Sequence, residues 1–328
     1  MHQFYKKLGT DILKKMFTAP IARLALTQGH LSTSSSSSLA SILNSRKYTS
    51  ITQGRKYTPD FKNYCKLPNG EVVSYFHDIP LEFNKQDGTV NMVVEIPRWT
   101  NAKFEINTKI EGNPITQDIK KGKVRFVNNI FPHHGYMHNY GAIPQTWEDP
   151  TVKNSSLDLF GDGDPLDVIE IGSQILELGQ VKKVKILGSL ALIDDGELDW
   201  KIVVINVEDE ASNNLNDIED VYKQFPQLLE ETRRWFKLYK LPTGKPENTF
   251  AFDGEYKSKL ETLEIIEECH QSWKNLINGK TDSKKISTKN STIEGSIGYT
   301  NFQTLSSITE ENLPDTEIPS EVDKIYYY

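Results

Sequence analysis

The stretch Gly161-Asp162-Gly163-Asp164-Pro165-Leu166-Asp167-Val168 places three aspartates within six residues, at the start of a predicted strand over 165–171. Three carboxylates this close together repel one another strongly unless cations lie between them. Ligand sets made only of oxygen select hard ions such as Mg²⁺ and Ca²⁺. The stretch therefore predicts a cation site at the end of a strand; taken alone, it also fits an acidic surface turn.

The spacing excludes an EF-hand calcium loop. Such a loop continues its acidic residues to position five, has glycine at position six and ends on a glutamate at position twelve. Counted from Asp162, Leu166 comes fifth and Asp167 sixth. The stretch therefore does not have the ligand pattern of an EF-hand.

A second acidic stretch, Asp194-Asp195-Gly196-Glu197-Leu198-Asp199-Trp200-Lys201, falls between two apolar segments that predict strands over 182–193 and 200–207. Residues in the loops of a rigid sheet often project into a shared site, although this stretch alone also fits a polar hairpin turn. Basic groups in the otherwise acidic body are Lys103, Arg125, Lys201 and Lys240, each of which by itself is a solvated surface charge.

Composition and charge exclude several classes of protein. The chain has 328 residues, of which 37% are hydrophobic and 25% charged, as in water-soluble globular proteins. No apolar run reaches the roughly 18 residues that a membrane-spanning helix needs, so we expect no membrane insertion. The residues after 56 hold 29 basic and 44 acidic side chains, a formal charge of −15. Nucleic-acid affinity depends on basic residues that neutralise phosphates, so we expect no nucleic-acid partner.

The first 56 residues differ from the remainder of the chain. They contain nine Lys or Arg residues and one acid, Asp11, with a serine-rich run over 32–38. Phe4, Leu8, Ile12 and Met16 recur at every fourth position, as on one face of a helix. This pattern is typical of a mitochondrial presequence, and the alternative is a disordered basic arm. We expect a targeting segment over 1–56, removal near Arg46, and a location in the mitochondrial matrix.

Strand patterns come first along the chain and helix patterns last. Strands are predicted over 93–96, 103–106, 123–127, 165–171, 182–193 and 200–207. Helices are predicted over 217–225, from Pro226 to about 239, and over 256–278. This order favours an α+β domain with a closed or partly closed antiparallel sheet, spanning 57–280. Residues 281–328 are rich in Ser, Thr and Asn and predict a polar tail, extended or disordered.

Three separate segments share a resemblance to one enzyme family. They are Met92-Val93-Val94-Glu95-Ile96-Pro97-Arg98-Trp99, then Phe131-Pro132-His133-His134-Gly135-Tyr136-Met137-His138-Asn139-Tyr140-Gly141, then the Asp162 stretch. In this order they resemble family I inorganic pyrophosphatase, whose signature is Asp-x-Asp-Pro-Leu-Asp-Val. The resemblance covers roughly 57–280. It implies Mg²⁺-dependent hydrolysis of pyrophosphate and a five-stranded OB-like β-barrel with flanking strands and C-terminal helices.

The resemblance also implies roles for individual residues, and every position carries the residue type that the family uses. The implied Mg²⁺ ligands are Asp162, Asp167 and Asp199, with Asp194 and Glu105 holding further ions. Asp164 is implied to be the base that takes a proton from the attacking water. The implied phosphate-binding residues are Arg125, Lys201, Tyr239 and Lys240. Completing the site are Lys103, Tyr136 as a proton donor, Tyr140 and Glu95.

The chemistry suits these residue types. Pyrophosphate carries several negative charges, so hydroxide attack on it meets Coulombic repulsion, which clustered cations reduce. Phosphoryl transfer asks for positioning and charge neutralisation more than covalent work by the protein. Lysine and arginine can then take the charge of the departing phosphate. Cations thus explain how an acidic protein can process an acidic substrate.

Three alternatives stay open at the level of sequence. His133, His134 and His138 suggest a zinc site, but their spacing does not fit one, and in the family this stretch is structural or at a subunit contact. An OB-fold nucleic-acid binder would need a basic groove with exposed aromatics, which the acidic body disfavours. A catalytically silent relative would tolerate loss of Asp164 or Arg125, yet both are present.

The family's eukaryotic members imply a homodimer, with Arg98, Trp99 and His134 at the contact.

Overall fold

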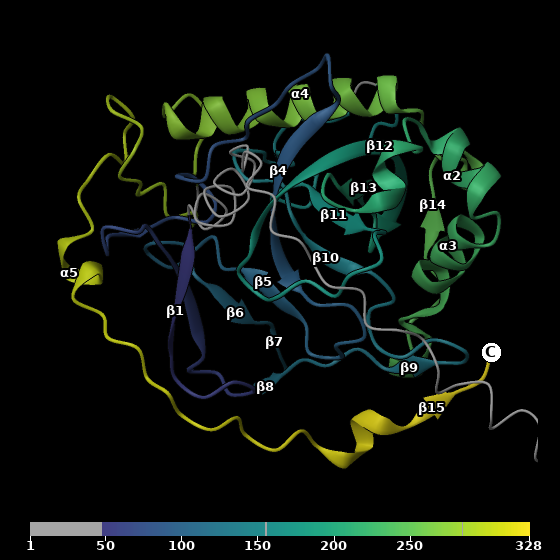
Figure 1. Ribbon diagram of the computed structural model, residues 1–328, viewed down its shortest axis with the longest axis horizontal. Helices are drawn as coiled ribbons and strands as arrows, with labels where there is room; N and C mark the ends of the chain where they lie inside the picture. The colour runs from purple at the N-terminus through teal and green to yellow at the C-terminus, as the bar shows by residue number, and fades with distance from the viewer. Residues whose placement is uncertain (1–47, 155, 284) are drawn as a thin grey trace, which may run out of the picture. The chain divides into compact units, whose positions relative to one another are not determined.

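Five strands pair edge to edge in a closed ring (Figure 1). The computed structural model describes residues 48–328 except 155 and 284. The ring strands are β4 (Thr89–Ile96), β10 (Asn139–Ala142), β11 (Asp167–Glu170), β12 (Val181–Asp194) and β13 (Glu197–Asn206). Their order is β4, β10, β11, β13, β12 and back to β4, with β11 and β13 parallel and all other pairs antiparallel. The predicted five-stranded OB-like barrel is therefore confirmed.

The sequence of the ring strands explains why they are buried on both faces. All eight residues of β4 are buried, and alternate side chains enter different clusters. Val90, Met92 and Val94 belong to one apolar core, whereas Val93 and Ile96 belong to another. The hairpin between β12 and β13 turns at Asp195 and Gly196, whose φ angles of 52° and 92° suit a two-residue turn. Continuous Val, Ile and Leu runs thus build the barrel, and polar residues close its ends.

A second sheet lies beside the ring and reaches further toward the N-terminus than expected. Its strands are β1 (Thr49–Gln53), β2 (Lys62–Lys66), β3 (Val72–Val73), β5 (Phe104–Ile106) and β6 (Ile115–Gln117), in the order β1-β2-β6-β5 with β3 on β2. Because β1 pairs with β2 along its whole length, the folded body begins before residue 57, earlier than the boundary predicted from the sequence. The remainder of the predicted targeting segment lies outside the described residues.

Short strands complete the sheets. They are β7 (Ile119–Lys120) with β8 (Lys123–Val124), β9 (Asn129–Ile130) with β15 (Ile325–Tyr326), and β14 (Thr249–Phe250) on β12. The strand predicted over 123–127 is too long, because only Lys123 and Val124 pair as a strand. Beyond them the backbone bonds to loops: the Arg125 N–H donates to Asp118 and the Val127 N–H to Asn101.

The predicted helices are present with slightly shorter bounds. They are α2 (Ile218–Gln224), α3 (Leu228–Leu238) and α4 (Lys259–Ile277), with the short helix α5 (Gln303–Ser306) and 3₁₀ turns η1 (Glu210–Asn213), η2 (Leu241–Thr243), η3 (Phe252–Gly254) and η4 (Ser320–Asp323). Helix α4 begins at a capping box in which Ser258 and Glu261 bond each other's backbone N–H. It packs along β12 and contributes Leu263 and Ile266 to one core and Trp273 to the other (Figure 1).

The C-terminal segment is extended, as one of the two predicted possibilities, and it is attached to the body. Asp78, which is buried, accepts hydrogen bonds from the backbone N–H groups of Ser291 and Thr292 at 2.8 and 2.9 Å. Leu305 packs against the small apolar cluster around Tyr64. The chain then ends beside β9, where β15 pairs in parallel (Figure 1). These contacts argue against a disordered tail for the described part of the segment.

The absence of a membrane-spanning helix was expected, and the state of the two cysteines is a further observation. Within residues 48–328 as described, no helix has the length and apolar character needed to cross a bilayer. Cys65 is buried and Cys269 partly buried, and both are free thiols.

Candidate active site

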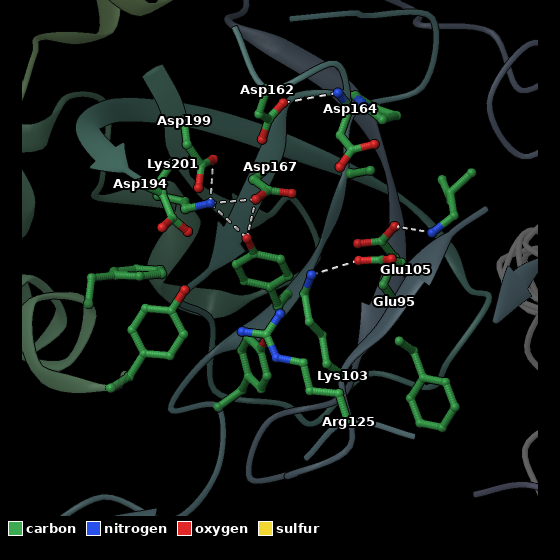
Figure 2. A pocket seen from close by; sticks show the side chains of 18 of the residues that line it. Glu95, Lys103, Glu105, Arg125, Asp162, Asp164, Asp167, Asp194, Asp199 and Lys201 are labelled. Atoms are coloured by element: carbon green, nitrogen blue, oxygen red, sulfur yellow. Dashed lines mark hydrogen bonds and ion pairs between the residues drawn. The ribbon is translucent and has the colours of Figure 1, made fainter. Parts of the chain in front are cut away.

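Residues from eight separate segments converge on one cavity of about 250 Å³ (Figure 2). Thirteen of the fourteen predicted site residues line it: Glu95, Lys103, Glu105, Arg125, Tyr136, Tyr140, Asp162, Asp164, Asp167, Asp194, Asp199, Lys201 and Tyr239. The fourteenth, Lys240, follows α3 and directs its ammonium group to Asp194 at the cavity wall. Residues that are up to 145 positions apart in the sequence thus share one site.

The loop before β11 is held in place by its own backbone. Two backbone hydrogen bonds connect Glu148 with the Asp162 stretch. The Gly163 N–H donates to the Glu148 carbonyl and the Glu148 N–H donates to the Asp164 carbonyl, both at 2.9 Å. A Cβ atom at Gly161 would lie 2.5 Å from the Glu148 carbonyl, so only glycine fits there. Gly163 has a φ of 89°, which glycine adopts without strain. The two glycines therefore let Asp162 and Asp164 project into the cavity.

Lys201 links the acidic residues of two strands. The parallel pairing of β11 and β13 sets Asp167 opposite Lys201. The Lys201 ammonium lies 2.5 Å from both Asp167 Oδ2 and Asp199 Oδ1, and 2.9 Å from the Tyr140 hydroxyl. Lys201 is 3% exposed, so its charge requires these partners. The neighbouring carboxylates raise the pKa of Lys201 well above its usual value despite its burial.

Three aspartates of the cavity, Asp162, Asp164 and Asp199, have raised pKa values. Burial, followed by repulsion from Asp199 and Asp164, places the pKa of Asp162 well above its ordinary value. Burial and repulsion from Glu105 raise the pKa of Asp164 to about 7. Burial also raises the pKa of Asp199 to about 7, although Lys201 opposes the shift. Because bound cations would favour the ionised form of these carboxyls, the cluster is suited to binding cations.

A basic group lies across the cavity from these aspartates (Figure 2). The Lys103 ammonium lies 2.6 Å from Glu105 and 3.7 Å from Asp118, and the Arg125 guanidinium donates to Asp118 at 3.0 Å. Burial alone would lower the pKa of Lys103, but the Glu105 carboxylate outweighs it and the pKa rises. Both side chains stay charged and face an opening large enough for a small anion.

Aromatic groups line the side of the cavity next to α3. Trp235 packs against Tyr136 and stacks on Tyr239, with ring centroids 5.2 and 5.0 Å apart. Burial raises the pKa of Tyr136 to about 12, so its hydroxyl remains protonated and available as a donor near pH 7. Glu95, on β4, accepts a hydrogen bond from the Ile106 N–H at 2.7 Å and thereby holds β5 beside the cavity.

The donor set fits a hard divalent cation. Carboxylate oxygens of Asp162, Asp199 and Glu148 lie within 4.8 Å of one another, and no nitrogen or sulfur ligand belongs to this group. Carboxylate oxygens are the ligands that Mg²⁺ and Ca²⁺ prefer. The acidic cluster is therefore able to hold a metal ion.

Sequence reasoning missed two carboxylates of the site. Glu148 joins Asp162 and Asp199, and Asp118 holds both Lys103 and Arg125. Neither lies in an acidic cluster of more than two residues. An available signal was the position of Glu148 in Thr146-Trp147-Glu148-Asp149-Pro150, where an acid follows a large apolar residue.

The three histidines of the 131–141 stretch do not meet. His133 pairs with Glu231 at 3.0 Å, His134 with the Trp99 carbonyl at 3.1 Å, and His138 with the Thr232 hydroxyl at 2.7 Å. Each ring thus has its own protein partner on a different residue. The expectation that this stretch is not a zinc site agrees with this geometry.

Comparisons with known proteins agree with the geometry. The family model described as inorganic pyrophosphatase matches residues 92–274. The chain is 53% identical over 293 residues to "Inorganic pyrophosphatase, mitochondrial" of Saccharomyces cerevisiae, covering 88% of this chain and 92% of the relative. It is 48% identical over 281 residues to "Inorganic pyrophosphatase" of Candida albicans, covering 85% and 97%.

Solved structures show the same fold. The inorganic pyrophosphatase of Schistosoma japonicum superposes with a TM-score of 0.82 at 40% identity, covering 85% of this chain and 100% of that one. An N-terminally truncated vacuolar soluble pyrophosphatase of Trypanosoma cruzi, solved in complex with PPi, gives a TM-score of 0.64 at 36% identity, covering 79% and 99%. The acidic cluster and the facing basic groups suit one small, highly charged anion, and the chain is a member of the inorganic pyrophosphatase family, a hydrolase of pyrophosphate.

Proposed function

We propose that this pyrophosphatase depends on Mg²⁺ and works in mitochondria as a homodimer. The observation that supports the metal requirement is the acidic cluster itself. Asp162, Asp199 and Glu148 approach within 4.8 Å of one another. Among the described residues, the ammonium group of Lys201 contacts one of these carboxyls, Asp199, and it also contacts Asp167. An acidic cluster with this charge excess is stable in its ionised form only when cations join it.

The residues proposed to hold the Mg²⁺ ions are Asp162, Asp167 and Asp199, with Asp194 and Glu105 holding further ions at the cavity edge. All five side chains line the cavity. Mg²⁺ bound by these residues would neutralise phosphate oxygens and lower the pKa of a bound water. Lys201 keeps Asp167 and Asp199 oriented for this task through its two 2.5 Å contacts.

Asp164 is proposed to accept the proton of the attacking water. Its carboxyl lines the cavity, and its pKa of about 7 suits a group that exchanges protons near neutral pH. The backbone N–H of Asp164 donates to Asp162 Oδ1 at 2.9 Å, so the base is fixed relative to a proposed metal ligand. Position and proton affinity thus agree.

The opposite wall is proposed to bind the two phosphates. Arg125 offers a planar guanidinium that can donate two parallel hydrogen bonds to phosphate oxygens. Lys201 and Lys240, which contact aspartates of the acidic side, would bind phosphate together with Tyr239. Lys103, Tyr140 and Glu95 would complete the site. Tyr136 is protonated near neutral pH because its pKa is raised to about 12, so it can donate to a departing phosphate oxygen. The wall stabilises the charge that develops on the departing phosphate.

The test is phosphate release from pyrophosphate by the purified chain, measured with Mg²⁺ and after chelation of all divalent cations. We expect release with Mg²⁺ and none after chelation. Release that persists unchanged in the chelated protein would disprove the metal requirement. No release under either condition would disprove the enzymatic function of this chain.

A mitochondrial location is supported by two observations. The S. cerevisiae relative is described as mitochondrial. Residues 1–56 contain nine basic residues and one acid, and the first described strand, β1, begins only at Thr49. A segment ending near Arg46 could therefore be removed without loss of a described strand. Fusion of residues 1–48 to a fluorescent protein should direct it to the matrix, and a cytosolic signal would contradict the proposal.

A homodimer is supported by exposed apolar side chains on the segments predicted to form the contact. Trp99 is 56% exposed and Phe131 55% exposed, and His134 is exposed beside them. Arg98 is partly buried and bonds the Gly172 carbonyl of its own chain, which makes it the least suited of the three predicted contact residues. Light scattering of the purified chain should give twice the monomer mass, and Trp99→Ser should lower it. A monomeric wild type would disprove the dimer.

A further inference from the structure

Glu148 is a buried carboxyl group with one oxygen that has no protein partner. It lies in the loop between β10 and β11, and its side chain is 4% exposed. Oε1 accepts a hydrogen bond from the Trp200 N–H at 3.1 Å. Oε2 is buried and has no hydrogen-bond partner within the described structure. Burial of an unsatisfied polar atom is unfavourable, so such an atom in a native fold calls for a missing partner.

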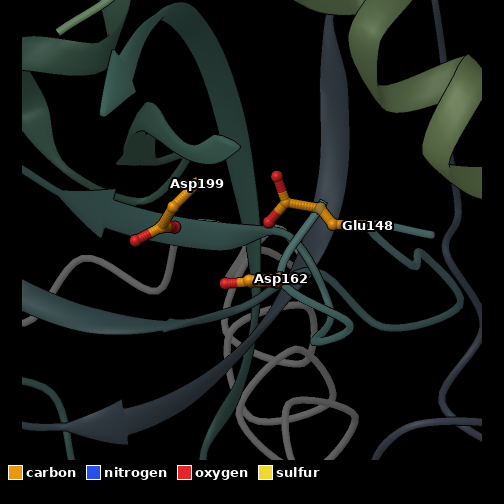
Figure 3. A group of neighbouring side chains, drawn as sticks. All are labelled: Glu148, Asp162 and Asp199. Carbon is orange, nitrogen blue, oxygen red and sulfur yellow. The ribbon is translucent and has the colours of Figure 1, made fainter. Parts of the chain in front are cut away.

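The carboxyl group of Glu148 lies close to the carboxyl groups of two proposed metal ligands, Asp162 and Asp199. Figure 3 shows the carboxyl groups of Glu148, Asp162 and Asp199 turned toward a common space. One oxygen of each lies within 4.8 Å of an oxygen of the others. Glu148 and Asp162 lie at different positions in the loop between β10 and β11, and Asp199 lies on β13. The two ends of this loop and one barrel strand therefore present oxygen ligands to the same point.

The backbone does not allow Glu148 to withdraw from this position. Its N–H donates to Asp164, and its carbonyl accepts from Gly163, so it is paired to the Asp162 loop on both sides of the residue. The absence of a side chain at Gly161 lets the two segments approach, because a Cβ there would lie 2.5 Å from the Glu148 carbonyl. The fold thus brings a third carboxyl against two others and fixes it there.

The neighbouring protein cation is already engaged elsewhere. The Lys201 ammonium contacts Asp167, Asp199 and the Tyr140 hydroxyl. It shares only Asp199 with the Glu148 group. The Glu148 and Asp162 carboxyls therefore meet without a positive side chain bonded to either in the described structure.

We propose that Glu148, Asp162 and Asp199 together bind one divalent cation, to which Glu148 contributes the oxygen that lacks a protein partner. This inference rests on the proposed metal-dependent function and adds a ligand to it. The competing explanation is a neutral Glu148 that serves only to hold the loop through Trp200. A glutamine at this position has nearly the same shape and can still accept the Trp200 bond, so it separates the two explanations.

The experiment is a titration of the purified, metal-free chain with Mn²⁺ as the probe, followed by the electron paramagnetic resonance of free Mn²⁺. In Glu148→Gln we expect one Mn²⁺ to bind about tenfold more weakly or worse, since changes around a metal commonly cost 10–100-fold in affinity. The melting temperature of the metal-free variant should not fall below that of the wild type, because the variant keeps the Trp200 bond and loses a repulsive charge. Glu197→Gln is the matched control, because Glu197 is an exposed carboxyl that lines the active-site cavity and is not a proposed ligand; it should leave all Mn²⁺ affinities within about twofold.

Equal Mn²⁺ stoichiometry and affinity in Glu148→Gln and the wild type would overturn the proposal and leave Glu148 as a structural residue. Glu148→Asp retains the charge on a shorter side chain; it should bind the weakened Mn²⁺ more tightly than the glutamine variant does, and it remains testable if the glutamine variant fails to fold. An aspartate variant that binds no better than the glutamine variant would also contradict the proposal. Because the wild type's Mg²⁺-dependent phosphate release is measured in parallel, a failure of the proposed function is distinguished from a failure of this ligand assignment.

Discussion

The cavity has a basic wall, formed by Lys103 and Arg125, and an acidic wall, formed by the aspartates, and the two differ in whether their charges are paired. On the basic wall, Lys103 and Arg125 each have acidic partners in Glu105 and Asp118. On the acidic side, Asp162 and Asp164, which line the cavity, and Glu148, which lies next to Asp162, have no lysine or arginine bonded to them in the described structure. The pKa of each is raised, first by burial. The positive charges of the basic wall are paired with carboxylates of the protein, whereas several carboxyls of the acidic wall have no cationic partner among the described residues.

This difference indicates which wall changes when ligands bind. Paired cations keep their positions, so the basic wall is preorganised for an anion and gains little from metal. Unpaired carboxyls must either hold protons or receive cations, so the charge of the acidic wall depends on pH and metal concentration. Substitutions on the two walls should therefore differ in size and in kind, as the following experiments test.

The largest effect is expected from Asp164→Asn on the acidic wall. This change removes the proposed proton acceptor but keeps the side chain's size, so kcat should fall about 10²–10⁴-fold, the usual contribution of a general base. Phosphate release at saturating Mg²⁺ and pyrophosphate measures it. Asp158→Asn, at a loop residue exposed to solvent and paired with Lys153, is the control and should retain wild-type kcat. A kcat within threefold of wild type in Asp164→Asn would remove this residue from the proposed mechanism.

A smaller effect is expected from Arg125→Lys on the basic wall. Lysine keeps the positive charge but cannot form two parallel bonds to a phosphate, so kcat/KM should fall about 10–100-fold, the equivalent of one strong charged hydrogen bond. Initial rates over a range of pyrophosphate concentrations measure the change. The matched control is Arg55→Lys at an exposed site, where kcat/KM should change less than about twofold. Loss of Mn²⁺ binding in Arg125→Lys would contradict the separation of the two walls.

The smallest effect is a pH dependence of stability that belongs to the acidic wall. The pKa of buried Asp199 is raised from 3.8 to about 7, so the folded state binds its proton more tightly than the unfolded state does. The resulting stabilisation is full below pH 4 and is lost as pH rises through about 7. The melting temperature of the metal-free chain should fall by a few degrees between pH 5 and 8, and Mg²⁺ should restore it most at pH 8.

Asp199→Asn should flatten that decline, because asparagine does not titrate. Scanning calorimetry with and without chelator over the same pH values makes the comparison. A metal-free melting temperature that stays level or rises from pH 5 to 8 would contradict the raised pKa of Asp199.

The acidic wall was easier to predict from the sequence than the remainder of the site. Asp162, Asp164 and Asp167 are adjacent in the chain, so their mutual repulsion is visible before any fold is known. The residues of the basic wall are scattered, and only the family resemblance connected Lys103 with Tyr239. Glu148 escaped both kinds of reasoning because its local signal, an acid directly after Trp147, does not reveal burial; the burial follows from the backbone bonds of Glu148 to Gly163 and Asp164.

In the fold, too, some elements were predictable from the sequence and others were not. The long apolar strands β12 and β13 and the helix α4 have patterns that extend over many residues, and their predicted positions were close to the observed ones. Strands such as β6 (Ile115–Gln117) have three residues or fewer, and β6 pairs with Asn63 some fifty positions earlier. So short a strand owes its existence to its partner, because three residues contain too little periodicity to reveal it.

The attachment of the C-terminal segment bears on how the molecule is assembled during synthesis. All five barrel strands lie between Thr89 and Asn206, so they can pair while later residues are still being added. The segment after α4 reaches back to Asp78 and then to β9, and its last strand consists of residues near the very end of the chain. Residues made after the barrel therefore hold segments made before or within it, and a nascent chain halted between α4 and β15 would have a formed catalytic cavity but would lack these outer contacts.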